Sequence, residues 1–244
     1  MRRIALLTAT ASLLLIVAAC GGSSSSSKTA TPAASGGAKS PAATSATAAT
    51  PSPATDETAF AASMLLTAAD FPAGYGEIPA TPDDTENPLT KACGEASEKG
   101  KTGKATSSDF SASADAPSIS EDVLVFAKDG DAGAGLDAIP ALIDCAVRAI
   151  NDGKLDNAGV TFSNTASKKI SIEAPGDKSY AFEVTAIGKV TGQDTPPVTL
   201  VFTLLFAREG RVGYQLTASG QTAFDTAELA GYAKKAAAKV KQRP

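Results

Sequence analysis

Residues 198–218 read VTLVFTLLFAREGRVGYQLTA. The first ten alternate between a wholly apolar face of Val, Leu and Phe and a face that also carries threonines, which is the two-residue period of a β-strand. Residues 211–218 alternate in the same way. Between the two runs, Arg208-Glu209-Gly210-Arg211 places a glycine where a tight turn needs one. This stretch therefore predicts a β-hairpin.

Further strand-like runs accompany this hairpin. They cover residues 110–114, 122–127, 168–174 and 180–190. In the run 122–127, residues 123–126 are all apolar, so apolar side chains point to both faces of that strand. Both faces can therefore be covered by other elements. With the helices described next, the order is helix, two strands, helix, four strands, helix. Because consecutive strands favour antiparallel pairing, we expect the α+β class, with about five or six strands and helices packed on one face.

Three segments carry apolar residues at helical spacing, at 57–69, 137–150 and 225–240. The middle segment contains Pro140, which fits a first helical turn if Asp137 caps the helix. The run from Gly130 to Gly135 before it is rich in glycine. It lacks the spacing of a dinucleotide-binding loop, and Asp131 would repel phosphate, so we predict a turn there.

The N-terminus carries an export signal. Arg2-Arg3 supplies positive charge, residues 4–17 are almost wholly apolar, and VAA places small residues directly before Cys20. These features define a signal peptide at residues 1–19. The run resembles the lipobox of bacterial lipoproteins, which implies that Cys20 is linked to a diacylglycerol, with acyl chains such as palmitate, and becomes the new N-terminus.

Two alternatives to lipidation remain open, namely an ordinary cleaved signal peptide and a transmembrane anchor. A spanning helix needs about 20 apolar residues, and the apolar run is shorter than that. Cysteine occurs only three times in the chain, so its position at the cleavage site is informative. We therefore expect a lipoprotein on the extracytoplasmic face of the cell membrane, held there by a diacylglyceryl anchor.

A linker and one domain follow the signal. Residues 20–55 are mostly Ser, Ala, Thr, Pro and Gly, with no Leu, Ile, Val or aromatic residue. Such a segment buries too little apolar surface to offset its ordering entropy, so we predict a disordered linker. From residue 56 to residue 244 the composition is that of a single globular domain with a sizeable core.

The charge balance and the missing residue types exclude several functions. All 26 acidic residues lie from residue 56 onward, whereas four of the 22 basic ones lie before residue 56, so the domain is negative and repels nucleic acid. The chain has no histidine, which removes the commonest general base and most zinc sites. We expect no enzyme activity, no catalytic residue, no metal and no cofactor.

Two cysteines remain in the domain once Cys20 is assigned to the lipid. An even pair in an exported protein favours a disulfide between Cys93 and Cys145. It would tie a long polar loop to the central helix and close a loop whose constraint is worth about 4 kcal/mol in the chain-entropy treatment. Free thiols are the alternative.

Basic residues gather near the C-terminus, at Lys234, Lys235, Lys239 and Lys241. Cations stabilise the carboxyl end of a helix, where the peptide dipoles place negative charge. A structural role therefore explains this cluster without an acidic partner.

The domain resembles a group of actinobacterial lipoproteins and the extracellular sensor domain of certain mycobacterial Ser/Thr protein kinases. The segments that carry the resemblance are MLLTAADFP at 64–72, the pair Cys93 and Cys145, VLVF at 123–126, the hairpin FAREGRV at 206–212 and the Ala-rich helix ending at Val240. It implies an antiparallel sheet flanked by helices, with a cleft suited to an unidentified ligand. The kinase sensors have two disulfides, whereas this chain offers one pair.

These observations predict a non-catalytic, sensor-like domain that binds a small molecule, a lipid or another envelope component. The alternative is an accessory protein-interaction subunit that acts by its position at the membrane surface. A lined cleft favours the first, and an exposed apolar patch favours the second. The sequence identifies no ligand-binding residue.

Overall fold

A computed structural model describes residues 56–78, 92–94, 99–113, 116–154, 160–190 and 196–241. The predicted signal peptide, Cys20 and the predicted linker lie outside these residues. The helical elements are α1 (Glu57–Ala62), the 3-10 turn η2 (Ala68–Asp70), α3 (Asp129–Asn151) and α4 (Thr226–Lys241). The strands are β1 (Gly76–Ile78), β2 (Lys101–Thr106), β3 (Asp109–Ser111), β4 (Ser118–Phe126), β5 (Val160–Ile170), β6 (Lys178–Val190), β7 (Val198–Glu209) and β8 (Val212–Gly220).

The strands form one antiparallel sheet of eight, in the order β1-β3-β4-β8-β7-β6-β5, with β2 also paired to β4. This confirms the α+β class. The predicted hairpin is the pair β7 and β8, in which Glu209 lies opposite Val212 and Gly210 adopts a positive φ of 57° in the turn. The sheet is larger than the five or six strands expected because polar strands such as β2 (KTGKAT) carry no apolar alternation.

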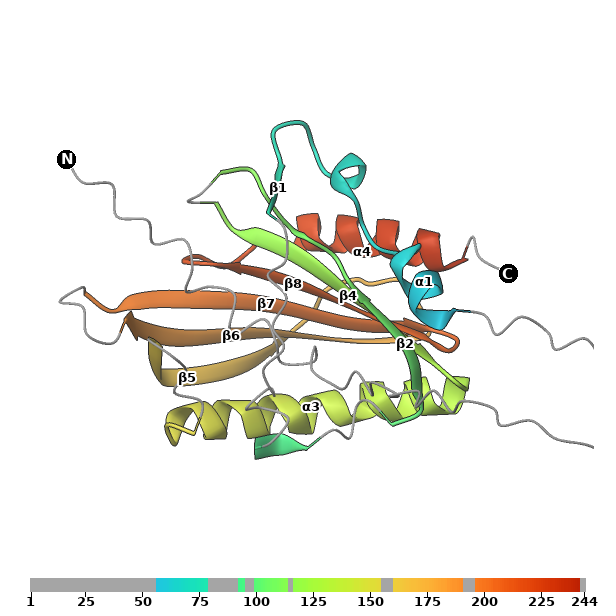
Figure 1. Ribbon diagram of the computed structural model, residues 1–244. Helices are drawn as coiled ribbons and strands as arrows, with labels where there is room; N and C mark the ends of the chain where they lie inside the picture. The colour runs from blue at the N-terminus through green and yellow to red at the C-terminus, as the bar shows by residue number, and fades with distance from the viewer. Residues whose placement is uncertain are drawn as a thin grey trace, which may run out of the picture.

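Helices cover both faces of the sheet, which corrects the expectation that they pack on one face. Figure 1 shows α3 along one face and α1 and α4 on the other. The reason lies in the central strands, whose two faces are both apolar. In β7, Leu205 packs in the core under α4, whereas Leu204 and Phe206 pack in the core under α3. A strand of this kind is stable only when both of its faces are covered.

The middle helix begins earlier than predicted. α3 starts at Asp129, so the glycine-rich run from Gly130 to Gly135 is helical and forms neither a turn nor a phosphate loop. Asp129 and Asp131 lie in the first turn, where acidic groups suit the positive end of the helix dipole. Pro140 lies inside the helix, and the apolar stripe that α3 buries against the sheet offsets the hydrogen bond that the proline removes.

Within the described residues, no helix is long and apolar enough to cross a membrane.

Candidate functional site

Nine polar side chains lie in three rows on the α3 side of the sheet, and we call them the polar panel. The rows are Thr106, Asp122 and Gln215; then Asp109, Ser120 and Thr217; then Ser111, Ser118 and Ser219. β2 and β3 supply the first column, β4 the second and β8 the third. The panel thus brings together residues more than 100 positions apart in the chain.

The strands carry this panel because polar and apolar residues alternate along them. On the opposite face, Phe110, Ile119 and Leu216 pack in the core beneath α4. On the panel face of β4, the next positions after Asp122 are apolar. They are Leu124 and Phe126, which pack in the core beneath α3. The panel is therefore a polar continuation of the apolar surface that holds α3.

Five members of the panel are buried, namely Ser111, Asp122, Gln215, Thr217 and Ser219. Hydrogen bonds within the panel offset part of the cost of this burial. Thr106 Oγ1 donates to Asp122 Oδ1 at 2.5 Å, and Gln215 Nε2 donates to Thr217 Oγ1 at 2.9 Å. The two hydroxyl oxygens of Ser118 and Ser219 lie 2.9 Å apart.

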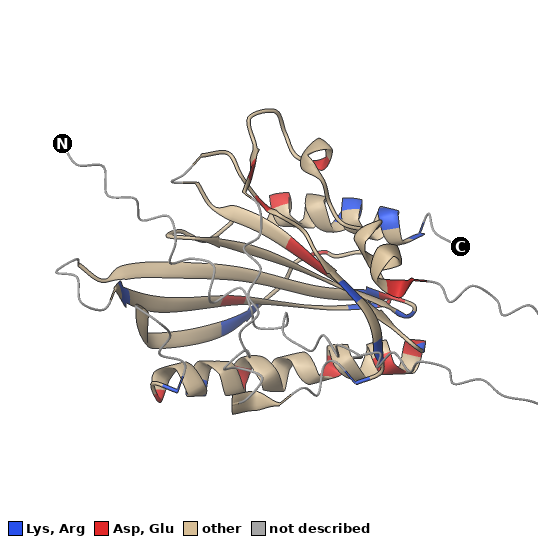
Figure 2. Ribbon diagram, in the orientation of Figure 1, with Lys and Arg blue, Asp and Glu red and all other residues tan. Residues whose placement is uncertain are grey.

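Two carboxyl groups of the panel have raised pKa values. Burial is the main cause for both Asp109 and Asp122. Lys104 Nζ lies 3.8 Å from Asp122 Oδ1 and opposes the rise of the Asp122 pKa. For Asp109, a hydrogen bond with Ser120 opposes the rise, whereas the charge of Asp122 adds to it. Figure 2 shows this neighbourhood as acidic positions on β4 beside basic positions on β2.

One side chain of the panel carries an unsatisfied acceptor. Gln215 is 3% exposed, and its Oε1 has no hydrogen-bond partner among the residues that the structure describes. The same side chain lines a hollow between the sheet and the first half of α3, where the walls are otherwise mostly apolar. Arg208 also lines this hollow, and within the described part of the chain its buried Nε likewise has no hydrogen-bond partner. Leaving a buried polar atom without a hydrogen-bond partner costs about 1–3 kcal/mol of stability. A water molecule or a ligand group that bonded to either atom would recover part of this cost.

The hollow has a volume of about 30 Å³. That volume holds a water molecule but no metabolite. Its roof consists of Ala132, Gly135, Leu136 and Ile139 of α3. The small residues among these let the helix approach the sheet closely. The polar panel, rather than the hollow, therefore offers the hydrogen-bonding groups that a ligand would need.

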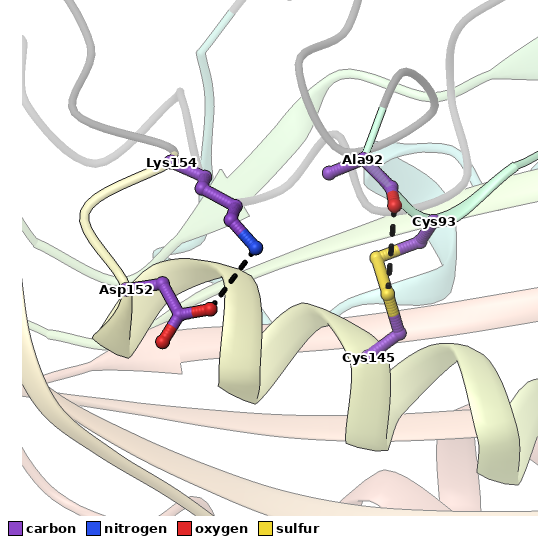
Figure 3. The surroundings of a disulfide bond; sticks show 5 residues. All are labelled: Ala92, Cys93, Cys145, Asp152 and Lys154. Carbon is purple, nitrogen blue, oxygen red and sulfur yellow. Dashed lines mark hydrogen bonds and ion pairs between the residues drawn. A yellow bond between two sulfur atoms is a disulfide. The ribbon is translucent and has the colours of Figure 1, made fainter.

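The predicted disulfide is present. Cys93 and Cys145 are joined, with a separation of 5.9 Å between their Cα atoms (Figure 3). Cys145 belongs to α3, and Cys93 packs against the core beneath that helix. The bond thus fixes the segment ahead of β2 to the helix that faces the panel side of the sheet.

The C-terminal lysines contact the domain itself. Lys239 Nζ donates to Asp70 Oδ2 at 2.6 Å, and Lys235 Nζ donates to the backbone oxygen of Asp70. Lys241 and Lys234 lie 3.7 and 3.8 Å from the carboxylates of Glu209 and Glu173. These contacts support the structural role predicted for the cluster.

Sequence reasoning missed the polar panel, although its pattern is visible in the sequence. SISED at 118–122 and QLTAS at 215–219 each alternate polar residues with mostly apolar ones. That pattern commonly marks a strand with one face in water. Here the polar face is half buried, which depends on how strands distant in sequence pair. Among the described residues, no group of three His, Cys, Asp or Glu is placed to hold a metal ion.

No protein-family model matches the chain, and no curated protein matches it in sequence. Among solved structures, the chain is similar to the extracellular domain of PknH from Mycobacterium tuberculosis. The identity is 13%, the TM-score is 0.42, and the match covers 79% of this chain and 99% of that one. A likeness of this size identifies no ligand and no functional residue.

Proposed function

We propose that this protein is a lipid-anchored, extracytoplasmic binding protein whose polar panel holds a small polar ligand without transforming it. The half-buried panel, with the unsatisfied Oε1 of Gln215 at its edge, is the observation that carries the proposal. Binding sites of this kind combine apolar walls with a few convergent polar groups.

The proposed location rests on the N-terminal sequence and on the disulfide. Arg2-Arg3, the apolar run and Cys20 form the pattern of a lipoprotein signal. The bond between Cys93 and Cys145 is of the kind that persists in oxidising compartments outside the cytoplasm. A diacylglyceryl group on Cys20 supplies two acyl chains, which are enough for stable anchoring.

The location is tested by metabolic labelling with a palmitate analogue in a host that processes lipoproteins. The wild-type chain is expected to incorporate the label and to remain with the membrane fraction. Cys20→Ala is expected to do neither. A wild-type chain that stays unlabelled and leaves the membrane fraction would overturn the anchoring proposal.

The non-catalytic assignment follows from the available side chains. The chain contains no histidine, so the commonest general base is missing. The panel offers hydroxyl, amide and carboxyl groups, which suit hydrogen bonding to a ligand. The described surface does not favour the alternative of a protein-docking subunit, because Ile78, 44% exposed, is the one large hydrophobic side chain exposed there.

Binding is tested by native mass spectrometry of the full mature chain, purified from the membrane of its own host. We expect a small molecule bound at one copy per chain. Thr217→Val removes a panel hydroxyl at nearly constant shape and is expected to reduce the bound fraction. Thr199→Val, on an exposed position of β7 outside the panel, is the matched control. Equal occupancy in both variants would place the ligand elsewhere, and an unliganded wild-type chain would count against the proposal.

A further inference from the structure

Lys104 and Asp122 form the most deeply buried ion pair between described residues. The Nζ of Lys104 lies 3.8 Å from Asp122 Oδ1, and the two side chains are 18% and 8% exposed. Figure 2 shows basic positions of β2 beside acidic positions of β4. By contrast, the side chains of the pair Lys178 and Asp137 are 43% and 56% exposed. The amine of Lys104 and the carboxyl group of Asp122 are thus held together with little access to solvent.

The strand pairing fixes this contact. Lys104 lies directly opposite Leu124 in the register of β2 and β4, so Asp122 is its diagonal neighbour on the same face of the sheet. Diagonal neighbours lie about 7–8 Å apart, which is within the reach of a long side chain. Thr106 lies directly opposite Asp122, and its Oγ1 donates to Asp122 Oδ1 at 2.5 Å. The backbone therefore sets the two groups side by side, and a hydroxyl orients the carboxyl group.

Burial favours the uncharged form of this pair. It is costly to remove a charged amine and a charged carboxylate from water. Burial raises the pKa of Asp122, although the charges of Lys104 and Lys101 oppose the rise. Transfer of one proton from Lys104 Nζ to Asp122 Oδ2 leaves a neutral amine and a carboxylic acid. A desolvated, neutral lysine is a nucleophile, and an uncharged carboxyl carbon is open to attack.

We propose that Lys104 and Asp122 condense into an isopeptide bond that joins β2 covalently to β4. The neutral Nζ of Lys104 attacks Cγ of Asp122, and a C–N bond forms. The bond between Cγ and Oδ2 breaks. Oδ2 leaves as water, with the proton that it received from the ammonium group and a second proton from Nζ. Nothing is oxidised or reduced, and no co-reactant is consumed.

The hydroxyl of Thr106 assists this step. Negative charge develops on Asp122 Oδ1 while the amine attacks, and a hydrogen-bond donor already aimed at that oxygen stabilises it. Oδ1 then remains as the oxygen of the new amide and keeps the bond from Thr106. The positions that the sheet imposes on the two groups replace the encounter of two separate reactants, which lowers the entropic part of the barrier.

A covalent link would suit β2, because its own side chains hold it weakly. The strand reads KTGKAT, and within the described residues it pairs with β4 alone. Gly103 is the one buried residue of β2, and it has no side chain to pack. The bond replaces the apolar anchoring that this strand lacks. It goes beyond the proposed function, because it forms whether or not the polar panel holds a ligand.

Peptide mapping tests the bond in the full mature chain. The protein is purified from the membrane of its own host, reduced, alkylated and digested with trypsin. Trypsin does not cleave after a lysine whose amine is part of an amide. We therefore expect the peptide 102–128, lighter than its sequence by one water molecule. Further digestion after Glu121 should leave 102–121 and 122–128 joined through the side chains of Lys104 and Asp122.

A variant and an internal control accompany this measurement. Lys104→Arg keeps the positive charge and removes the nucleophilic amine, so we expect cleavage after residue 104 and the peptide 105–128 at its full mass. The pair Lys178 and Asp137 is the internal control, since its Nζ and Oδ1 atoms are only 2.5 Å apart but both side chains are exposed. Trypsin is expected to cleave after Lys178 in every sample.

Each result decides the inference. A wild-type chain that is cleaved after Lys104 and gives 105–128 at its full mass would overturn it. A link that fragmentation maps to Lys101 would overturn the assignment to this pair. A second link at Lys178 would show that closeness alone is sufficient and would reject burial as the cause. The mass of any bound small molecule is measured separately, so none of these results decides the binding proposal.

Discussion

Glu121 and Lys239 bind opposite ends of the same peptide group. The N–H of Leu66 donates to Glu121 Oε2 at 2.6 Å, and Lys239 Nζ donates to the carbonyl oxygen of Leu65 at 2.7 Å. Glu121 belongs to β4 and is 1% exposed, whereas Lys239 belongs to α4. One peptide unit between α1 and η2 therefore joins the sheet to the last helix.

The buried carboxyl of Glu121 makes the stability of the fold depend on pH. Burial raises its pKa to about 8, although the hydrogen bond from Leu66 and the charge of Lys239 oppose the rise. Between the unfolded value of about 4.3 and the folded value, the native state binds more protons than the unfolded state. The contribution of Glu121 to the free energy of unfolding is therefore largest in acid and falls as the pH rises through this window.

Glu121→Gln removes this titration and keeps an acceptor for Leu66. The free energy of unfolding is measured by urea denaturation at pH 5 and pH 8. Relative to the wild type, that of the variant is expected to be higher at pH 8 than at pH 5 by a few kcal/mol. The pKa values of Asp109 and Asp122 are also raised. The variants Asp109→Asn and Asp122→Asn therefore measure how much these two groups contribute to the pH dependence of the unfolding free energy. A difference between wild type and variant that is the same at both pH values would show that Glu121 does not titrate in this range.

Lys239 is expected to be the lysine of α4 that matters most for stability. Lys239→Met removes the bonds to Leu65 and to Asp70 and is expected to cost about 1–3 kcal/mol of unfolding free energy. Burial alone would raise the pKa of Asp70, but hydrogen bonds from Lys239 and Thr67 lower it overall. The ionised Asp70 therefore stabilises the wild type, and this stabilisation is lost as the pH falls through the lowered pKa of Asp70. In the Lys239→Met variant, the decrease in stability over the same pH range should be smaller.

The matched control for this experiment is Lys234→Met. Lys234 is 60% exposed and lies 3.8 Å from the exposed carboxylate of Glu173. An exposed pair of this kind contributes little, so we expect a change below about 0.5 kcal/mol. Equal effects of the two substitutions would mean that general charge on α4, rather than the contact with Leu65, stabilises the fold.

Two glycine substitutions are expected to act in opposite directions. A Cβ at Gly103 in β2 would collide with the backbone of Glu57 in α1, so Gly103→Ala should displace α1 and destabilise the protein. A Cβ at Gly130 meets nothing within 4 Å. Because residue 130 lies in α3, Gly130→Ala should stabilise by about 0.5–1 kcal/mol. Thermal unfolding measures both, and a destabilising Gly130→Ala would contradict the early start of α3.

The disulfide is expected to contribute about 4 kcal/mol, because it closes a loop with a sequence separation of 52 residues. Cys93→Ala with Cys145→Ala should lower the melting temperature measured by circular dichroism. A reductant should lower that of the wild type to the same value and leave the double variant unchanged. A reductant that lowers both equally would point to an effect unrelated to this bond.

The parts of the fold that follow from local patterns were predictable. The alternation in 198–218 identified the β7 and β8 hairpin, and the count of domain cysteines identified the pairing of Cys93 with Cys145. The predicted helix from residue 57 to 69 stops at Ala62 because the Leu65–Leu66 peptide bonds to Glu121 and Lys239 instead of continuing the helix. Both partners are far away in sequence, so no local pattern reveals them.

The polar panel escaped prediction for the same reason. Asp122 and Gln215 become neighbours only through the pairing of β4 with β8. Their burial also depends on how the sheet is covered, and alternation along a strand does not report that. The sequence therefore predicts the alternation within each strand. It does not predict the strand pairing that brings those residues together as a candidate site.

The disulfide also determines which strands can bear mechanical load. Tension applied to the chain ahead of Asp56, as an anchor there would apply it, travels along the backbone to Cys93 and crosses directly to Cys145. β2, β3, β4 and the first two thirds of α3 lie within the closed ring between these residues and are bypassed by the force. Two of the three columns of the panel belong to these strands. Pulling on the N-terminus therefore cannot extend β2, β3 or β4 while the disulfide is intact.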